Sequence, residues 1–152
     1  MILQQVTGSA KSIILADEIL RQVSLQCGCR VEHSSAYSYL TATIGGKRFH
    51  ANERLIRGKR CGSVVITVVR GRSLYGLAKK FIRVICPCMR SWDFALITWF
   101  PRPVYPNSDP LTVRIDWGGI DVNNIVDVNV VSLNDIQPSR VAVGIDSIHN
   151  NN

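Results

Sequence analysis

Apolar residues recur at helical spacing in two parts of the chain. Between residues 10 and 22 they lie mostly three or four positions apart, and Ser9 can cap the start of a helix. Residues 74–85 carry a more regular apolar stripe, with basic residues on the opposite surface. Ser73 can cap this second segment, and Pro87 ends it because proline cannot continue a helix. We therefore predict helices over about 10–22 and 74–85.

The remaining apolar positions alternate with polar ones or run continuously, as they do in β-strands. The period is two from Val23 to His33, and residues 37–44 are rich in aromatic and β-branched types. Gly45-Gly46 then offers a tight turn into a strand over 47–50. Further strands are predicted over 62–69, 93–100, 111–117, 125–133 and 140–146.

Together these elements predict one α+β domain over residues 1–148, built on a mostly antiparallel sheet with two helices. Neither a repeat nor a long linker divides the chain. Its 152 residues, 46% of them hydrophobic, suffice for one core. We expect the last residues, 149–152, to form a disordered tail.

Basic residues are concentrated in the middle of the chain. Between Lys47 and Arg90 there are twelve Lys and Arg residues and a single acid, Glu53. Residues 1–102 have a net charge of +11, whereas residues 103–152 have a net charge of −4. Clustered positive charge attracts polyanions, so RNA is the preferred partner, and a merely solvated basic face is the alternative.

The predicted strand, turn and helix between residues 62 and 85 would bring several of these cations together. Arginine side chains at the turn and amides at a helix N-terminus both suit phosphate oxygens. This pattern does not choose between single-stranded and double-stranded RNA. The residues that we expect to contact RNA are Arg57, Lys59, Arg60, Arg70, Arg72, Ser73, Lys79, Lys80 and Arg83.

Two close cysteine pairs, Cys27-Gly-Cys29 and Cys86-Pro-Cys88, flank the basic segment. Four thiolates would complete a tetrahedral zinc site, and His33 could replace one of them. Both pairs are spaced more tightly than the usual zinc-binding pairs, so buried thiols without a metal are the alternative, with redox chemistry a further one.

The chain lacks the features of exported and membrane-spanning proteins. No apolar run approaches the roughly 20 residues that cross a bilayer, and the first residues do not resemble a secretory signal. We therefore expect a cytoplasmic or nuclear protein, in which cysteines are reduced and metal binding is more common than disulfides.

Few residues suggest catalysis. The chain has three histidines, and it contains no phosphate-binding glycine loop, nucleophile elbow or metalloprotease helix. We expect a protein that is not an enzyme. The weakest alternative is an enzyme that uses Cys61 or Cys86 together with His33.

Residues 61–85, CGSVVITVVRGRSLYGLAKKFIRVI, resemble the strand–turn–helix of the tombusvirus suppressors of RNA silencing. The resemblance implies phosphate contacts from Arg70, Arg72 and Ser73, with Lys79 and Lys80 as lesser candidates. The tryptophans that cap RNA duplex ends in that family lie in an N-terminal segment. Here all three lie in the second half: Trp92, Trp99 and Trp117.

The two cysteine pairs and the basic middle are also similar to the small first-reading-frame proteins of sobemoviruses. That resemblance implies silencing suppression, support of virus movement and, in some members, zinc binding. This chain departs from the better-known members, in which two residues separate the paired cysteines, because one residue separates them here.

Charge and resemblance together predict a non-enzymatic RNA-binding protein that acts as a viral suppressor of RNA silencing. The alternative is an interaction or movement module. In that case the basic part of the chain meets an acidic host protein, or the acidic C-terminal part of a second copy in a homo-oligomer.

Overall fold

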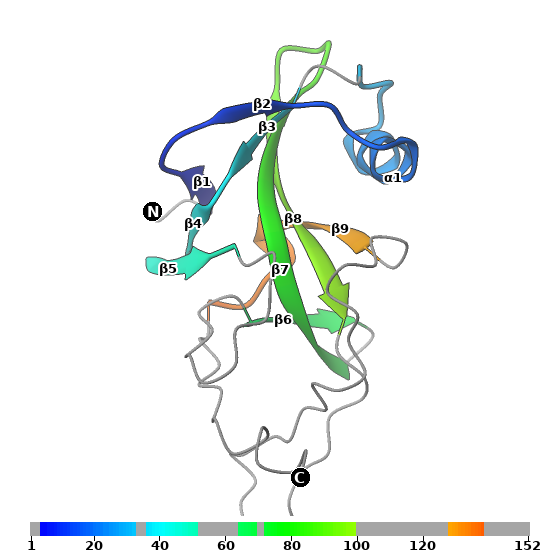
Figure 1. Cartoon of the computed structure of the whole chain (residues 1–152). Helices are drawn as coiled ribbons and strands as arrows, with labels where there is room; N and C mark the ends of the chain where they lie inside the picture. The colour runs from blue at the N-terminus through cyan, green and yellow to red at the C-terminus, as the bar shows by residue number, and fades with distance from the viewer. Residues whose placement is uncertain (1–3, 33–35, 52–63, 70–71, 100–127, 139–152) are drawn as a thin grey trace, which may run out of the picture.

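The computed structural model describes residues 4–32, 36–51, 64–69, 72–99 and 128–138. These residues form mostly antiparallel β-sheets with one α-helix, which confirms the α+β class. Within these ranges, no helix is long and apolar enough to cross a membrane. In chain order the elements are β1 (Gln5–Thr7), β2 (Lys11–Ile13), α1 (Asp17–Cys27), β3 (Ala36–Tyr39), β4 (Thr41–Ile44), β5 (Lys47–His50), β6 (Val64–Val69), β7 (Arg72–Ile85), β8 (Ser91–Trp99), β9 (Val128–Ser132) and the 3-10 helix η2 (Leu133–Asp135) (Figure 1).

The strands form two antiparallel sheets. The smaller sheet has the order β1-β4-β5, and the larger has the order β2-β3-β7-β8-β9, with β6 paired to β7 as well. The 14-residue strand β7 organises the larger sheet. Along one edge it pairs with β8, and along the other it pairs first with β6 and then with β3.

The helix predicted over 74–85 is wrong, because this segment lies within β7. A β-bulge explains the misleading pattern, since the pairing with β8 shifts register between Ala78 and Lys80. Ala78 and Phe81 therefore face one side of the sheet, while Ile82 faces the other. Burial of both faces, combined with one extra residue, produces apolar spacings of three and four that resemble a helix.

The first helix begins later than predicted over 10–22, at Asp17, and the segment before it includes the short strand β2. The helix also continues through Cys27, and residues 28–32 after it form no strand, so the strand predicted from Val23 to His33 is wrong. The helix ends at Gly28, which has φ 70°, and the amide of Gly28 donates a hydrogen bond to the carbonyl of Ser24. Glycine adopts this left-handed conformation without a steric penalty, which makes it a common helix terminator.

Several predicted strands are confirmed. The segment 37–44 forms β3 and β4, Gly45 and Gly46 make the turn into β5, and β6, β8 and β9 lie within or close to their predicted ranges. The strands predicted over 111–117 and 140–146, and the tail at 149–152, lie outside the described residues.

Hydrophobic side chains fill both faces of the larger sheet. The core between the two sheets includes Val6, Ile44, Phe49, Phe81 and Ile97. On the opposite face, Val23 of α1 packs in a second core with Ile82, Val84, Phe94 and Leu96. The described residues therefore form three layers, with α1 on one face of the larger sheet and the smaller sheet on the other (Figure 1).

A partly buried carboxylate joins the two sheets. Asp93 of β8 accepts two hydrogen bonds from the guanidinium of Arg83, at 2.8 and 3.0 Å, and a third from the amide of Val6 in β1, at 2.9 Å. Hydrogen bonds that involve an ionised group are among the stronger ones in proteins. This carboxylate therefore fixes β1 against the β7–β8 pair.

Two glutamines attach α1 to the edge of the larger sheet. The side-chain oxygen of Gln22 accepts a hydrogen bond from the amide of Val130 at 2.9 Å, and the side-chain nitrogen of Gln26 donates one to the carbonyl of Val130 at 2.7 Å. The two side chains therefore replace the strand that would otherwise pair with β9 at this point, and they protect a sheet edge.

We predict that Gly76→Ala destabilises the fold by about 1–3 kcal/mol, because a side chain there overpacks the core. A Cβ atom on Gly76 would collide with Cγ2 of Ile97 and lie 2.9 Å from Cε3 of Trp99. Urea unfolding of the variant measures the loss. Gly28→Ala is the control because no atom lies within 4 Å of its Cβ position, leaving only the cost of φ 70°, about 1 kcal/mol. Equal stability of Gly76→Ala and the wild type would contradict this packing.

Candidate metal centre and basic surface

Four cysteines lie at the junction of α1 with the β7–β8 hairpin, a place that we call the cysteine corner (Cys27, Cys29, Cys86 and Cys88). Cys27 is the last residue of α1, and the left-handed turn at Gly28 leads directly to Cys29. Cys86 follows the last residue of β7, and Cys88 lies in the turn before β8. The helix terminator and the hairpin turn thus present one pair of cysteines each.

The hairpin turn has a defined geometry. The amide of Met89 donates to the carbonyl of Cys86, and the amide of Cys86 donates to the carbonyl of Arg90, both at 2.9 Å. Met89 has φ 68°, as expected for the left-handed residue that ends a three-residue hairpin loop. Pro87 suits the second position of such a turn because its φ is fixed near the required value.

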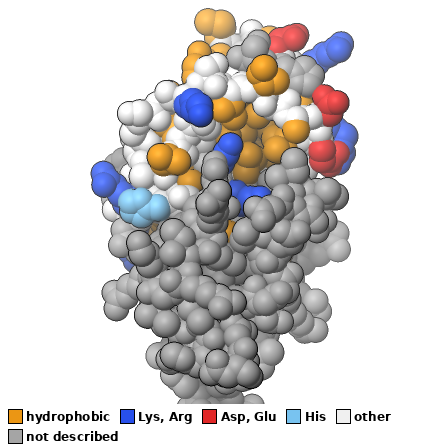
Figure 2. All heavy atoms as spheres, viewed as in Figure 1, with side chains coloured by type: hydrophobic (Ala, Val, Ile, Leu, Met, Phe, Trp, Pro, Cys, Tyr) orange, Lys and Arg blue, Asp and Glu red, His pale blue; other side chains and the backbone are white. Residues whose placement is uncertain are grey.

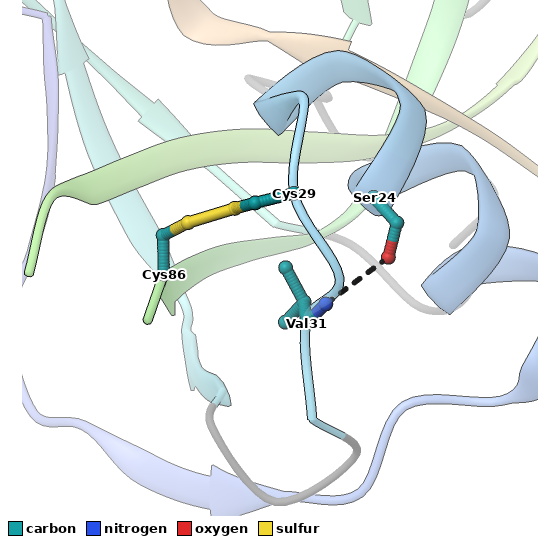
Figure 3. The surroundings of a disulfide bond; sticks show 4 residues. All are labelled: Ser24, Cys29, Val31 and Cys86. Carbon is teal, nitrogen blue, oxygen red and sulfur yellow. Dashed lines mark hydrogen bonds between the residues drawn. A yellow bond between two sulfur atoms is a disulfide. The ribbon is translucent and has the colours of Figure 1, made fainter. Parts of the chain in front are cut away.

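Three sulfur atoms of the corner lie within 4.8 Å of one another, those of Cys29, Cys86 and Cys88. Cys29 and Cys86 are joined in a disulfide, with their Cα atoms 7.1 Å apart (Figure 3). The sequence-based expectation of reduced cysteines therefore does not describe this pair. Cys88 is exposed, and it lies close enough to Cys27 for a thiolate at Cys88 to affect the ionisation of Cys27.

Cys27 is the fourth thiol of the corner and is half-buried. Burial raises the pKa of its thiol above the ordinary value, and the nearby Cys88 raises it further. A nearby metal ion would have the opposite effect, because it stabilises the thiolate. Burial and the nearby Cys88 therefore favour the protonated form of Cys27.

Aromatic and basic side chains flank the corner. Trp92 of β8 lies across from Val84 of β7, on the same face of the sheet as Cys86, and packs against the helix-side core together with Cys27 and Cys29. The guanidinium carbon of Arg90 lies 5.8 Å from the centre of the Trp92 ring. The indole nitrogen of Trp92 is buried and has no hydrogen-bond partner among the described residues. A buried donor of this kind normally has an acceptor.

The chain that follows Cys29 is held against α1. The amide of Val31 donates a hydrogen bond to the side chain of Ser24 at 3.3 Å, and Val31 is buried in the helix-side core (Figure 3). This contact fixes the direction in which the chain leaves the corner. His33, which the sequence offered as an alternative metal ligand, lies outside the described residues.

The residues predicted to contact RNA are spread along β7 and beyond. Arg57, Lys59, Arg60 and Arg70 lie outside the described residues. Arg72 and Ser73 begin β7, so Ser73 does not cap a helix. The C-terminal half of the same strand contains Lys79, Lys80 and Arg83.

Lys79, Lys80 and Arg83 do not share one surface of the sheet. Arg83 pairs with Asp93 towards the smaller sheet. Lys80 lies across from Leu96, which belongs to the core on the opposite, helix-side face. Lys79 occupies the bulge and is only 8% exposed. The prediction that a helix presents them together is therefore wrong.

The structure reveals exposed basic residues that the sequence reading did not single out. Arg48 and His50 of β5 are exposed and alternate with Phe49, which is fully buried between the sheets. The alternation in Lys47–His50 was the available signal, since it assigns Phe49 to the core and its neighbours to solvent. Sequence reasoning counted Arg48 within the basic segment without assigning it a face.

No protein family, curated protein or solved structure matches this chain.

We predict that iodoacetamide modifies Cys88 faster than Cys27 in the folded protein at pH values of about 8. The thiolate is the reactive form, Cys88 is exposed, and the raised pKa of Cys27 keeps more of its thiol protonated. Peptide mass mapping over time measures both rates. The Cys27 rate should continue to rise as the pH increases above the ordinary cysteine pKa, and faster labelling of Cys27 than of Cys88 would contradict the structure.

Proposed function

We propose that this chain is a non-enzymatic RNA-binding protein whose cysteine corner holds a structural zinc ion in the reduced state. The observation that carries RNA binding is the charge of the segment from Lys47 to Arg90, with twelve basic residues and one acid. The described part of this segment begins with Lys47, Arg48 and His50, all exposed on β5.

This distribution favours phosphate contacts that do not depend on base sequence. Arginine and lysine side chains neutralise phosphates and release counterions, which makes binding strong at low salt and weak at high salt. Because residues 72–85 form a strand, these contacts would come from side chains and not from a helix N-terminus. Sequestration of RNA through its backbone would suit the silencing suppression that the viral resemblance implies.

The positions of the sulfur atoms support a zinc ion at the cysteine corner. Two thiolates on one tetrahedral zinc lie about 3.8 Å apart, given Zn–S bonds of about 2.3 Å, and three sulfurs of the corner already lie within 4.8 Å. Cys27, beside Cys88, would complete the four ligands. The 7.1 Å between the Cα atoms of Cys29 and Cys86 slightly exceeds the roughly 4.4–6.8 Å of most disulfides, and an ion between the sulfurs accommodates this separation.

The surroundings of the corner also suit thiolates. Arg90 lies directly across the hairpin from Cys86, and Arg30 follows Cys29, so cations accompany the negative charge that four thiolates and one zinc would carry. The indole nitrogen of Trp92 needs an acceptor, and a thiolate on the same sheet face is one. The zinc would link α1 to the β7–β8 hairpin, as the disulfide does in this structure.

RNA binding is tested by fluorescence anisotropy with single-stranded and double-stranded RNA over a range of salt concentrations. We expect the logarithm of affinity to fall linearly with the logarithm of salt, with a slope of roughly 0.7–0.9 per phosphate contact. Arg70→Ala/Arg72→Ala should weaken binding, whereas Arg21→Ala, which removes a charge from α1, should change it little. Absence of binding to either RNA at low salt would refute the proposed function.

Zinc binding is tested on the reduced protein by native mass spectrometry with and without a chelator. We expect the mass of one zinc ion, lost on chelation together with thermal stability, since structural zinc contributes to folding. Cys88→Ser should lose the ion or bind it weakly. Cys61→Ser is the matched control, because Cys61 lies outside both cysteine pairs. If the wild-type protein has the mass of the polypeptide alone, with no bound metal ion, the proposed zinc site is refuted.

A further inference from the structure

We propose that the outer face of the smaller sheet is the surface that binds the phosphate backbone of RNA. This outer sheet face consists of Gln5, Thr7, Thr41, Thr43, Arg48 and His50. The inference rests on the proposed function and specifies where RNA binds. None of these six residues belonged to the contact set expected from the sequence.

The strand register defines the face. Val6, Ala42 and Phe49 are buried in the core between the sheets, so their neighbours on each strand point away from that core. Gln5, Thr43 and Arg48 are aligned across the three strands in one row. Thr7, Thr41 and His50 form a second, parallel row.

Hydrogen bonds hold the β1 and β4 part of the face in place. The hydroxyl of Thr41 donates to the carbonyl of Thr7 at 2.8 Å, and the two hydroxyl oxygens are also 2.8 Å apart. Since the Thr41 proton is used in the first bond, Thr7 is the donor in the second. Beneath them, the amide of Val6 is bonded to Asp93, which anchors β1 to the larger sheet. The backbone of β1 and β4 is therefore positioned by contacts within the protein itself.

The charge of the smaller sheet suits a polyanion. Its three strands read QVT, TATI and KRFH, and they contain no Asp or Glu. Figure 2 shows blue and pale blue side chains together at the left edge, where β5 lies in Figure 1, while red side chains gather on the side of α1.

The chemistry of the face indicates which part of RNA it would contact. Arg48 and His50 are two residues apart on one strand, about 7 Å, so they can approach successive phosphates of a strand. The imidazole of His50 is the one aromatic ring among these six residues, and the Phe, Tyr and Trp side chains typical of sheets that stack and read bases are absent from them. It would therefore bind RNA of any sequence.

Arg83 of β7 is less suited to this role. It already forms a two-pronged ion pair with Asp93 and is only partly exposed. Contact with phosphate there would compete with the carboxylate that joins the sheets. Arg48, by contrast, is exposed on β5.

The test compares two variants that each remove one exposed positive charge, Arg48→Gln on β5 and Lys11→Gln on β2. Anisotropy with single-stranded RNA at several salt concentrations gives the affinity and its salt slope. We expect Arg48→Gln to weaken binding several-fold and to lower the slope by roughly 0.7, the share of one phosphate contact. His50→Gln combined with it should weaken binding further. Lys11→Gln should leave both quantities close to the wild type.

Circular dichroism and thermal unfolding establish that each variant is folded, which is expected because Arg48 and Lys11 are exposed. If the wild type binds RNA but the Arg48 and Lys11 variants bind equally well, or lose equal affinity, the outer sheet face is not the binding surface and the proposed function stands. If the wild type does not bind RNA at low salt, both proposals fail. A strong preference for one base sequence would also overturn this inference.

Discussion

The arrangement of the described residues depends on β7, a long strand buried on both faces. This strand pairs with β6, β3 and β8 and so forms the centre of the larger sheet. The cores on its two faces hold α1 and the smaller sheet. The bulge at Lys79 lets Ala78 and Phe81, which are three residues apart, face the same core. Apolar burial is the dominant favourable contribution to folding, so this strand determines where the other elements lie.

The two candidate sites are consequences of that strand. Where β7 ends, the hairpin turn places Cys86 and Cys88 beside the end of α1, which the helix-side core and two glutamines hold in position. On the other face, the core between the sheets fixes Phe49, and this directs Arg48 and His50 to solvent. The metal centre and the basic surface therefore lie on different sides of the larger sheet, and a metal could stabilise the fold without contacting RNA.

The sequence identified strands by their β-branched and aromatic residues or by a continuous apolar run, and the hairpin of Gly45-Gly46 by its turn residues, and all of these are local properties of the chain. Alternation misled from Val23 onward, where the chain continues as α1. The spacing of apolar residues could not distinguish a helix from a strand that contains a bulge and is buried on both faces. The strand β7 can be recognised only from the strands that pair with it. The close cysteine pairs predicted a shared site, and the structure brings three of the sulfurs together. Lys80 and Arg83 face opposite sides of the sheet because of the strand register, and a count of charges along the sequence gives no information about register.

The measurement that tests RNA binding at the outer sheet face most directly is a titration of the ¹⁵N-labelled protein with single-stranded RNA, followed by amide chemical shifts. We expect the largest shifts in β4 and β5, around Thr43, Arg48 and His50, and small shifts in α1 and around Lys80. Shifts confined to α1 or the cysteine corner, or no shifts at low salt, would contradict the proposal.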